Sequence, residues 1–384
     1  MTELTKEFYE ELVEIRHYLH QHPELSNEEF ETTKFLKRKL EEWGIAIVPT
    51  SMKTGVIAEI GDKSNGKVIA LRADIDALPI NEKTGLPYSS VNEGIMHACG
   101  HDFHQTSLLG AAKILKENED KLNGLVRLIF QPAEEVQGGA VEVIQAGHLE
   151  DVQAILGFHN HPKLKVGEIA LIEEGIMASV DQFFIKVHGI GTHAAEPQLG
   201  VDVPIVISTI LTQLQTIVAR NIPAREAIVL SVTHIETGQA WNVLPDDGFF
   251  EGTIRSFNQD LRKETKQRFV KIIENTAESL GASVEIIWGS SAPVTYNCPK
   301  LTKIVVEGSK KVANVIQATP SNAGEDFSHY QEKISGVFAF IGTNGEEGAN
   351  GWHHSNFLVK DEALPIAVNY YVENAFHVLD NFLV

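Results

Sequence analysis

The sequence predicts an α/β protein with two domains, the smaller inserted into the larger. In the first and last parts of the chain, strand-like runs alternate with helical patterns, and acidic or histidine residues follow the strand ends. Such alternation is typical of a largely parallel sheet with functional groups along its carboxyl edge. In between, the order becomes strand, helix, strand, strand, helix, strand, which indicates a ferredoxin-like sandwich. The larger domain is expected at 1–177 and 293–384, and the insertion at 178–292.

Two amphipathic helices are predicted at the start of the chain. Apolar residues recur at helical spacing from Thr5 to His20, and Pro23 disfavours continuation of that helix. Ser26 is expected to cap a second helix, which stops at Gly44. Strands are then expected at Ile45–Val48, Gly55–Ile60 and Val68–Ala73.

The remaining predicted elements follow the same two patterns. In the larger domain they are helices at Thr106–Glu117, Gly138–Ala146 and Ala363–Leu379, and strands at Leu125–Phe130 and Ala154–Phe158. In the insertion they are helices at Val203–Arg220 and Leu261–Leu280, and strands at Phe183–His188, Ile228–Glu236, Gly248–Phe257 and Ser283–Trp288.

Length, charge and cysteine content narrow the class of protein. A chain of 384 residues exceeds one ordinary domain, and its net charge of −20 is a poor match for nucleic acid or an anionic membrane surface. Met1–Glu14 lacks the basic start and apolar core of a signal peptide, and no apolar run reaches the length of a membrane span. Cys99 and Cys298 alone make no disulfide framework. We expect a soluble cytoplasmic protein that binds neither nucleic acid nor membranes.

The nine residues Met96–His104 carry the strongest functional signal. They include a thiol, three imidazoles and a carboxylate. Cys and His bind borderline metals such as Zn²⁺, and side chains two residues apart on a turn or extended segment share a face, so Cys99 and His101 can reach one ion. A buried thiol beside incidental histidines is the alternative. It is disfavoured because three remote clusters, at 131–135, 157–161 and 352–355, also contain His or Glu.

Further candidate residues follow the predicted strands. Asp74 and Asp76 come just past one buried strand, Glu134 and Glu135 follow a second, and His159 follows a third. Adjacent glutamates on an extended segment point to opposite sides, so both can face one site only if the backbone turns there. Loop-capping aspartates and surface glutamates are the structural alternatives.

The insertion supplies three candidates of its own. His193 follows a glycine-rich turn, Asn242 lies in a loop between strands, and Arg255 ends a strand. An arginine fork suits a carboxylate well, although each of these residue types, taken alone, is more often structural.

Taken together, eight segments resemble the M20 metallopeptidase and amidohydrolase family, most closely its branch of hippurate hydrolases, auxin-conjugate hydrolases and N-acetyl-amino-acid deacetylases. In the family's order, the segments are His20–Leu25, Leu71–Pro79, Met96–His104, Phe130–Glu135, Gly191–Pro197, Gly252–Arg255, Gly324–Phe327 and His353–Phe357. The resemblance implies an α/β/α zinc-peptidase-like catalytic domain with an inserted ferredoxin-like α+β domain that serves as a lid and often dimerises.

The resemblance also implies two divalent metal ions per chain. Their five ligands, here called the ligand set, map onto Cys99, His101, Glu135, His159 and His353. The family's last ligand stands four residues before an aromatic residue, which selects His353 over His354. Zn²⁺, Mn²⁺, Co²⁺ and Ni²⁺ all suit such a shell.

Other roles are implied by the same resemblance. Glu134 is the expected general base, and Asp76 or Asp74 is expected to orient a ligand histidine, with the choice left open. His193 is expected to stabilise the tetrahedral oxyanion, either in its own subunit or in a partner's, while Asn242 and Arg255 hold the substrate's carboxylate.

These observations predict a metal-dependent amidohydrolase that hydrolyses the amide bond of N-acyl amino acids, chiefly N-acetyl ones, through a metal-activated water with a glutamate base. N-acetyldiaminopimelate is the most specific substrate suggested, and a homodimer through the inserted domain is expected. A dipeptidase or aminopeptidase with the same centre is the alternative. A catalytically silent binding protein is disfavoured because the ligand set and Glu134 are all present.

Overall fold

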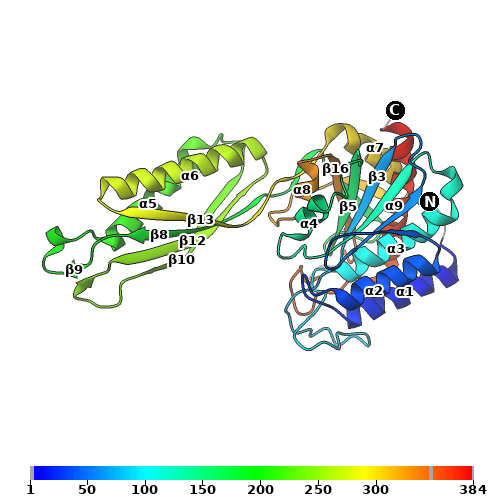
Figure 1. Cartoon of the computed structure of the whole chain (residues 1–384), viewed down its shortest axis with the longest axis horizontal. Coiled ribbons are helices and arrows are strands. Elements are labelled where there is room, and N and C mark those ends of the chain that lie inside the picture. Colours follow the sequence, from blue (N-terminus) through cyan, green and yellow to red (C-terminus); the bar gives the residue numbers. More distant parts are fainter. Residues whose placement is uncertain (1–3, 346–348, 383–384) are drawn as a thin grey trace. The chain divides into compact units, whose positions relative to one another are not determined.

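A computed structural model of the chain describes residues 4–345 and 349–382 and divides into two compact units (Figure 1). The larger unit consists of Met1–Ile176, Tyr296–Thr319 and Asp326–Val384. The smaller unit consists of Met177–Thr295 and Pro320–Glu325. The chain of the larger unit is therefore interrupted by that of the smaller one.

An eight-stranded mixed sheet forms the centre of the larger unit, in the order β1-β2-β4-β3-β5-β16-β6-β15. The strands are β1 Ala46–Val48, β2 Val56–Gly61, β3 Val68–Asp74, β4 Leu125–Gln131, β5 Ala154–His161, β6 Glu168–Leu171, β15 Asn314–Gln317 and β16 Ser335–Gly342. The four neighbours β4, β3, β5 and β16 are mutually parallel, whereas β1, β2 and β6 each pair antiparallel with a neighbour. These central strands are buried almost throughout, as expected for a parallel sheet covered on both faces.

Helices cover both faces of this sheet (Figure 1). One layer contains α1 Lys6–Gln21, α2 Phe30–Glu42, α3 His101–Glu117, α7 Pro299–Ser309 and α9 Leu364–Asn381. The short helices α4 Gly139–Gln145 and α8 Ser328–Gln331 pack together against β4 and β16. Helix α3 lies between the sheet and helices α1, α2 and α9, so almost all of its side chains are buried.

The parallel pairing brings the ends of separate strands to one edge. Residues Asp74 and Gln131 are register partners at the ends of β3 and β4. Strand β5 ends at His161, opposite Gly342 at the end of β16. The segments that follow β3, β4 and β5 therefore start from the same carboxyl edge, where α/β proteins place their functional groups.

The smaller unit is a four-stranded antiparallel sheet, β10-β12-β8-β13, with two helices packed against it. In chain order its elements are β8 Val180–His188, α5 Val203–Thr216, β10 Ile228–Thr237, β12 Asp247–Ser256, α6 Gln259–Ser279 and β13 Ser283–Ala292. This is the predicted ferredoxin-like order, and with the mixed sheet of the larger unit it confirms the predicted α/β fold class. A short strand pair in this unit is formed by β9 Thr192–His193 with β11 Val243–Leu244. A second short pair, β7 Glu174–Met177 with β14 Thr295–Asn297, lies chiefly in the larger unit.

Two predicted helix starts were wrong. Helix α3 begins at His101, five residues before the predicted Thr106, because Gly100 adopts a left-handed conformation (φ +83°) that starts the helix there. Helix α2 begins at Phe30 and is not capped by Ser26. The Ser26 hydroxyl instead donates a hydrogen bond to Asp76 Oδ2 at 2.7 Å, a contact 50 residues away in sequence.

Helix α5 continues into a π-helical turn, Ile217–Asn221, and the combined helix is long and rich in apolar residues. Together, Val203–Asn221 form a 19-residue helix that meets the requirements of a membrane span by length and mean hydropathy (1.3). Polar residues interrupt the apolar ones, and a third of its most apolar window is buried. Its buried side chains form part of the core of the smaller unit, as is common for an amphipathic core helix.

A buried ionic network joins α1 to the start of α3. The His20 ring contacts Asp102 Oδ2 through Nδ1 at 3.0 Å and Glu82 Oε1 through Nε2 at 3.2 Å. Arg16 Nε donates to the same Asp102 oxygen at 3.1 Å. Burial alone would lower the pKa of His20, but Asp102 and Glu82 outweigh it and raise that pKa to about 9. His20 is therefore an imidazolium that donates two hydrogen bonds at neutral pH.

Replacing His20 with Gln is expected to destabilise the protein in a pH-dependent way. The folded pKa of about 9 lies above the ordinary value of 6.5, so the stabilisation is fully present below that ordinary value and is lost as the pH rises through the folded pKa. A shift of this size corresponds to roughly 3 kcal/mol. Urea unfolding of both proteins at about pH 6 and about pH 9.5 measures the effect. The difference in free energy of unfolding should shrink at the higher pH, and an unchanged difference would contradict the assignment.

Candidate metal centre

The structure brings the ligand set together at the carboxyl edge of the central strands in the larger unit. Cys99 Sγ lies 3.4 Å from His159 Nε2, and His353 Nε2 lies 3.4 Å from Glu135 Oε2. His101 Nε2 is 3.8 Å from Glu135 Oε1. Glu135 thus lies between the two histidines, and overlapping triplets of these residues have donor atoms within 4.8 Å of one another.

A glycine shapes the turn that carries Cys99 and His101. Gly100 has φ +83°, and a Cβ added to it would lie 2.5 Å from the side-chain nitrogen of Asn160. That nitrogen donates a hydrogen bond to the Cys99 carbonyl at 2.6 Å. A larger residue at position 100 would therefore both strain the backbone and displace Asn160, which follows His159 on β5.

A tight turn after β4 brings both glutamates to the site. Ala133 and Gln137 have positive φ values of 53° and 59°, and the Gln137 amide donates to the Glu134 carbonyl at 2.8 Å. The Glu135 amide donates to Asp76 Oδ2 at 3.0 Å, and Glu134 Oε1 accepts from the Asp326 amide at 3.4 Å. The backbone turn that the sequence analysis required is present, so these adjacent side chains share one site.

His353 reaches the site from an unusual backbone conformation. Its φ is +62°, its side chain is 54% exposed, and its amide donates to the Ala98 carbonyl at 2.9 Å. The neighbouring His354 ring instead accepts a hydrogen bond from the Asn356 amide at 3.1 Å. The geometry therefore directs His353 rather than His354 toward Glu135.

The two candidate aspartates contact different histidines. His101 Nδ1 donates to the backbone carbonyl of Asp76 at 2.8 Å and lies 3.3 Å from its Oδ1. Asp74 Oδ1 instead accepts from His104 Nδ1 at 2.6 Å, and its distance from His101 Nε2 is 3.7 Å. His104 Nε2 accepts from the Asn160 amide at 2.9 Å. Asp76 thus orients His101 directly, whereas Asp74 fixes His104 and, through it, the strand end beside His159.

Sequence reasoning assigned no role to several side chains that surround the site. Trp352 Nε1 donates to the Asn160 carbonyl at 3.2 Å, and its ring packs edge-on to His159 with centroids 4.6 Å apart. The buried Arg72 donates to Asp74 Oδ2 and to Asp326 Oδ1, both at 2.8 Å. Arg72 and Asp326 do lie in segments that resemble the family, but only the folded chain shows their contacts.

The electrostatics of the site suit a bound cation. Burial and then Glu135 raise the pKa of the Cys99 thiol well above its usual value. For His101, burial lowers the pKa, but Asp74 and Asp76 outweigh it and raise the pKa to about 10. A bound cation would stabilise the Cys99 thiolate, which burial and Glu135 otherwise disfavour. It would also take the place of the proton that Asp74 and Asp76 stabilise on the His101 imidazole.

The donor atoms also fit divalent metal ions by their chemistry. His101 Nε2 and Glu135 Oε1 are buried and have no hydrogen-bond partner among the described residues. Buried polar atoms are rarely left without a partner, and the combination of thiolate, imidazole and carboxylate is typical of borderline divalent metals. The residues present therefore fit metal binding.

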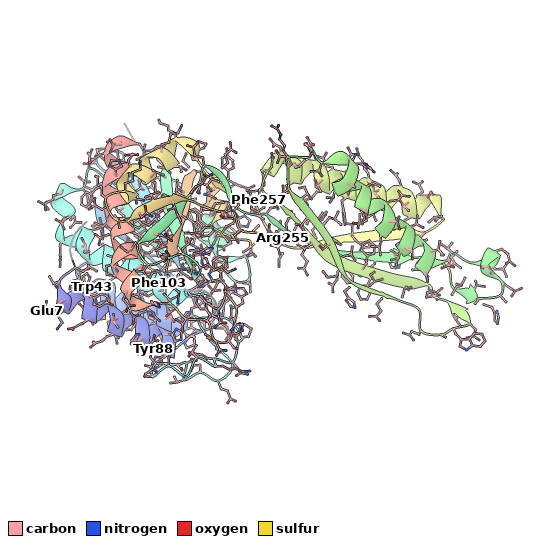
Figure 2. All side chains as sticks on the ribbon, turned by 180° about the vertical axis from the view of Figure 1, so that it is seen from behind. Glu7, Trp43, Tyr88, Phe103, Arg255 and Phe257 are labelled. Carbon is pink, nitrogen blue, oxygen red and sulfur yellow. The ribbon has the colours of Figure 1, made fainter. Side chains whose placement is uncertain are left out.

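The other three candidate residues, His193, Asn242 and Arg255, lie in the smaller unit. Register pairing places His193 opposite Val243, and the Ala194 amide donates to the Asn242 carbonyl at 3.1 Å, so His193 and Asn242 are close together. Arg255 lies near the end of β12 (Figure 2). Arg255 is half-buried, burial lowers its pKa, and its guanidinium forms no hydrogen bond or ion pair within the described ranges.

Comparisons with known proteins place the chain among metal-dependent hydrolases. The profile of peptidase family M20/M25/M40 matches residues 70–376. An N-acetyl-L-cysteine deacetylase of Bacillus subtilis is 47% identical over 97% of this chain and 89% of its own length. An N-acetylcysteine deacetylase of the same organism is 44% identical over 98% of both chains. A solved Bacillus subtilis structure, described as a dinuclear metal binding peptidase from the M20 family, superposes with a TM-score of 0.87 at 42% identity, covering 98% of this chain and 99% of the other.

Two neighbouring glycines test the turn that carries the glutamates. A Cβ at Gly139 would lie 1.6 Å from the Pro132 carbonyl oxygen, whereas a Cβ at Gly138 would meet nothing within 4 Å. We expect Gly139→Ala to lower the free energy of unfolding by several kcal/mol, because backbone must move, and Gly138→Ala by less than about 1 kcal/mol. Urea unfolding of the two variants makes the comparison. Equal effects would show that the tight packing of this turn is unimportant.

Proposed function

Because this chain belongs to peptidase family M20/M25/M40, we propose that it is a metal-dependent amidohydrolase that removes the acyl group, chiefly acetyl, from N-acyl amino acids. The observation that carries the proposal is the meeting of the ligand set with Glu134 at one edge of the sheet. The two relatives named as N-acetylcysteine deacetylases support amide hydrolysis and make N-acetylcysteine the first substrate to test.

The ligand set would hold two divalent metal ions, and Zn²⁺, Mn²⁺, Co²⁺ and Ni²⁺ are all compatible with its donors. The dinuclear centre named for the related Bacillus subtilis structure supports this number. When bound, such ions polarise the substrate carbonyl and make a water molecule acidic near neutral pH. The Cys99 thiolate and the Glu135 carboxylate partly offset the added positive charge.

Glu134 is the proposed general base. It is 6% exposed, and it lies beside the ligand set with one oxygen near the Asp326 amide. In this role its carboxylate takes a proton from the attacking water and passes it to the nitrogen of the departing amine. The products are the free amino acid and the carboxylate of the acyl group.

Three residues of the smaller unit are proposed to contact substrate. His193 would donate a hydrogen bond to the oxyanion that forms when the carbonyl is attacked, in its own subunit or in a partner's. Asn242 and Arg255 would hold the carboxylate of the amino acid. The half-buried and unpaired guanidinium of Arg255 supports this role, because a desolvated cation gains most from a bound anion.

Two further proposals concern the role of the smaller unit and the cellular location. We propose that the smaller unit closes over the site and forms the interface of a homodimer, which light scattering in solution would test. A cytoplasmic location agrees with the two cysteines, both of which are free thiols in the structure.

Replacing Glu134 with Gln is expected to lower kcat by roughly 10²- to 10⁴-fold, because the proton acceptor is lost while the side chain keeps its size. The protein is stripped of metal, reloaded with Zn²⁺, Mn²⁺, Co²⁺ or Ni²⁺ in turn, and assayed for release of amine. The substrates are N-acetylcysteine, other N-acetyl amino acids, N-acetyldiaminopimelate, hippurate and free dipeptides. Glu150→Gln, an exposed site in the same unit, is the matched control.

The proposal is supported if deacylation needs metal, is retained in wild type and Glu150→Gln, and is lost in Glu134→Gln. Cleavage of dipeptides alone would establish the peptidase alternative in its place. Full activity in Glu134→Gln would remove Glu134 from the role of base.

Arg255→Met should selectively impair substrates that carry a free carboxylate. Loss of a charge-assisted contact corresponds to a fall in kcat/KM of about 10- to 100-fold for N-acetyl amino acids. The matching N-acetyl amino acid amides, which lack that charge, should change little, and the exposed Arg268→Met serves as the control. An equal loss for acids and amides would contradict a role in binding the carboxylate.

A further inference from the structure

An arginine of the first helix is buried deep in the larger unit. Arg16 is 1% exposed, and its guanidinium carbon lies 5.4 Å from the centre of the Tyr88 ring. Its Nε donates to Asp102 Oδ2 at 3.1 Å, and its Nη1 donates to the Val359 carbonyl at 3.0 Å and to Asp361. One guanidinium therefore holds two carboxylates and one backbone carbonyl.

The partners of Arg16 lie in two separate segments of the chain, and each of these segments carries part of the ligand set. Asp102 follows His101 in the first turn of α3, three residues after Cys99. Val359 and Asp361 come six and eight residues after His353, just before α9. Arg16 lies 86 residues from Asp102 in sequence and 343 residues from Val359. It thus links the turn that carries two ligands to the segment that carries the last one.

The segment of His353 needs such an anchor. Its left-handed backbone (φ +62°) is unfavourable for a residue with a Cβ and persists only where surrounding contacts hold it. Its side chain is 54% exposed, so packing alone fixes it weakly. The His353 amide bonds to the Ala98 carbonyl at 2.9 Å, and the Lys83 amide to the Ser355 carbonyl at 2.8 Å. Arg16 adds the charged contacts that hold the same segment from within the protein.

We propose that Arg16 is a positioning residue that sets the distance between the Cys99–His101 turn and His353, and thereby the affinity for the metal ions. The inference rests on the proposed metal centre. Contacts behind metal ligands commonly change metal affinity by about 10- to 100-fold, although they never touch the ion. Arg16 itself does not contact the ligand side chains, so any effect on the metal must pass through the segments that it joins.

The chain offers a closely matched control in Arg127. This arginine is also buried, and it also bonds to two carboxylates and one backbone carbonyl, namely Glu59, Asp151 and the His148 carbonyl. None of these partners lies in a segment that carries the ligand set. The carboxylate partners of Arg127 are partly exposed, so Arg127→Met should remove a buried arginine and its partly buried charge pairs without moving a ligand.

The test is a titration of the metal-stripped full chain with Co²⁺. Absorption from the cobalt–thiolate bond reports binding at Cys99, and visible bands report both sites. Wild type, Arg16→Met, Arg16→Lys and Arg127→Met are compared, and urea unfolding gives the stability of each. We expect Arg16→Met to weaken Co²⁺ binding by about 10- to 100-fold and Arg127→Met by less than about threefold. Arg16→Lys, which keeps the charge but fewer contacts, should fall between wild type and Arg16→Met.

Equal Co²⁺ affinities in Arg16→Met and Arg127→Met would overturn the inference. Should Arg16→Met fail to fold, Asp361→Asn takes its place. That change removes a partly exposed partner on the His353 side, and it should weaken binding while Asp151→Asn does not. A wild-type chain that binds no Co²⁺ would instead refute the proposed metal centre, so the two failures are distinguishable.

Discussion

The structure depends on how buried negative charge is balanced at the carboxyl edge of the central sheet. Asp74, Asp76 and Asp102 are each at most 1% exposed. Charges removed from water are stable only when paired and hydrogen-bonded, so each needs a cationic or donor partner. Arg72 pairs with Asp74, and Arg16 pairs with Asp102. Arginine side chains thus balance these two aspartates, while the carboxylate of Glu135 and the imidazoles of the ligand set are the proposed metal ligands.

Chain topology explains how distant residues reach this edge. The chain leaves the larger unit after Ile176 and re-enters it at Tyr296, and β16 then pairs in parallel with β5. This pairing places the late segment beside the strand that ends near His159. The insertion therefore interrupts the chain of the larger unit without disturbing the order of the central strands.

The residue types of the site, and the fold class, could be predicted from the sequence. Cys99 and His101 stand out because a thiol and an imidazole two residues apart are typical metal donors, and the paired glutamates stand out because they directly follow an apolar strand. The contacts behind them could not be predicted. The hydroxyl of Ser26 bonds to Asp76 and not to its own helix, and Arg16 meets the His353 segment across more than three hundred residues. Local patterns cannot reveal such pairs, since only the folded backbone brings them together.

In the proposed function, this edge of the sheet binds two metal ions and amide hydrolysis needs both of them. The most direct measurement is to add Zn²⁺ or Mn²⁺ in small increments to the metal-stripped chain, with bound metal and N-acetylcysteine turnover recorded on the same samples. We expect no turnover without metal and a rate that levels off at two bound ions per chain. Undiminished turnover in the metal-free protein, or a turnover rate that does not rise with the amount of bound metal, would contradict this expectation.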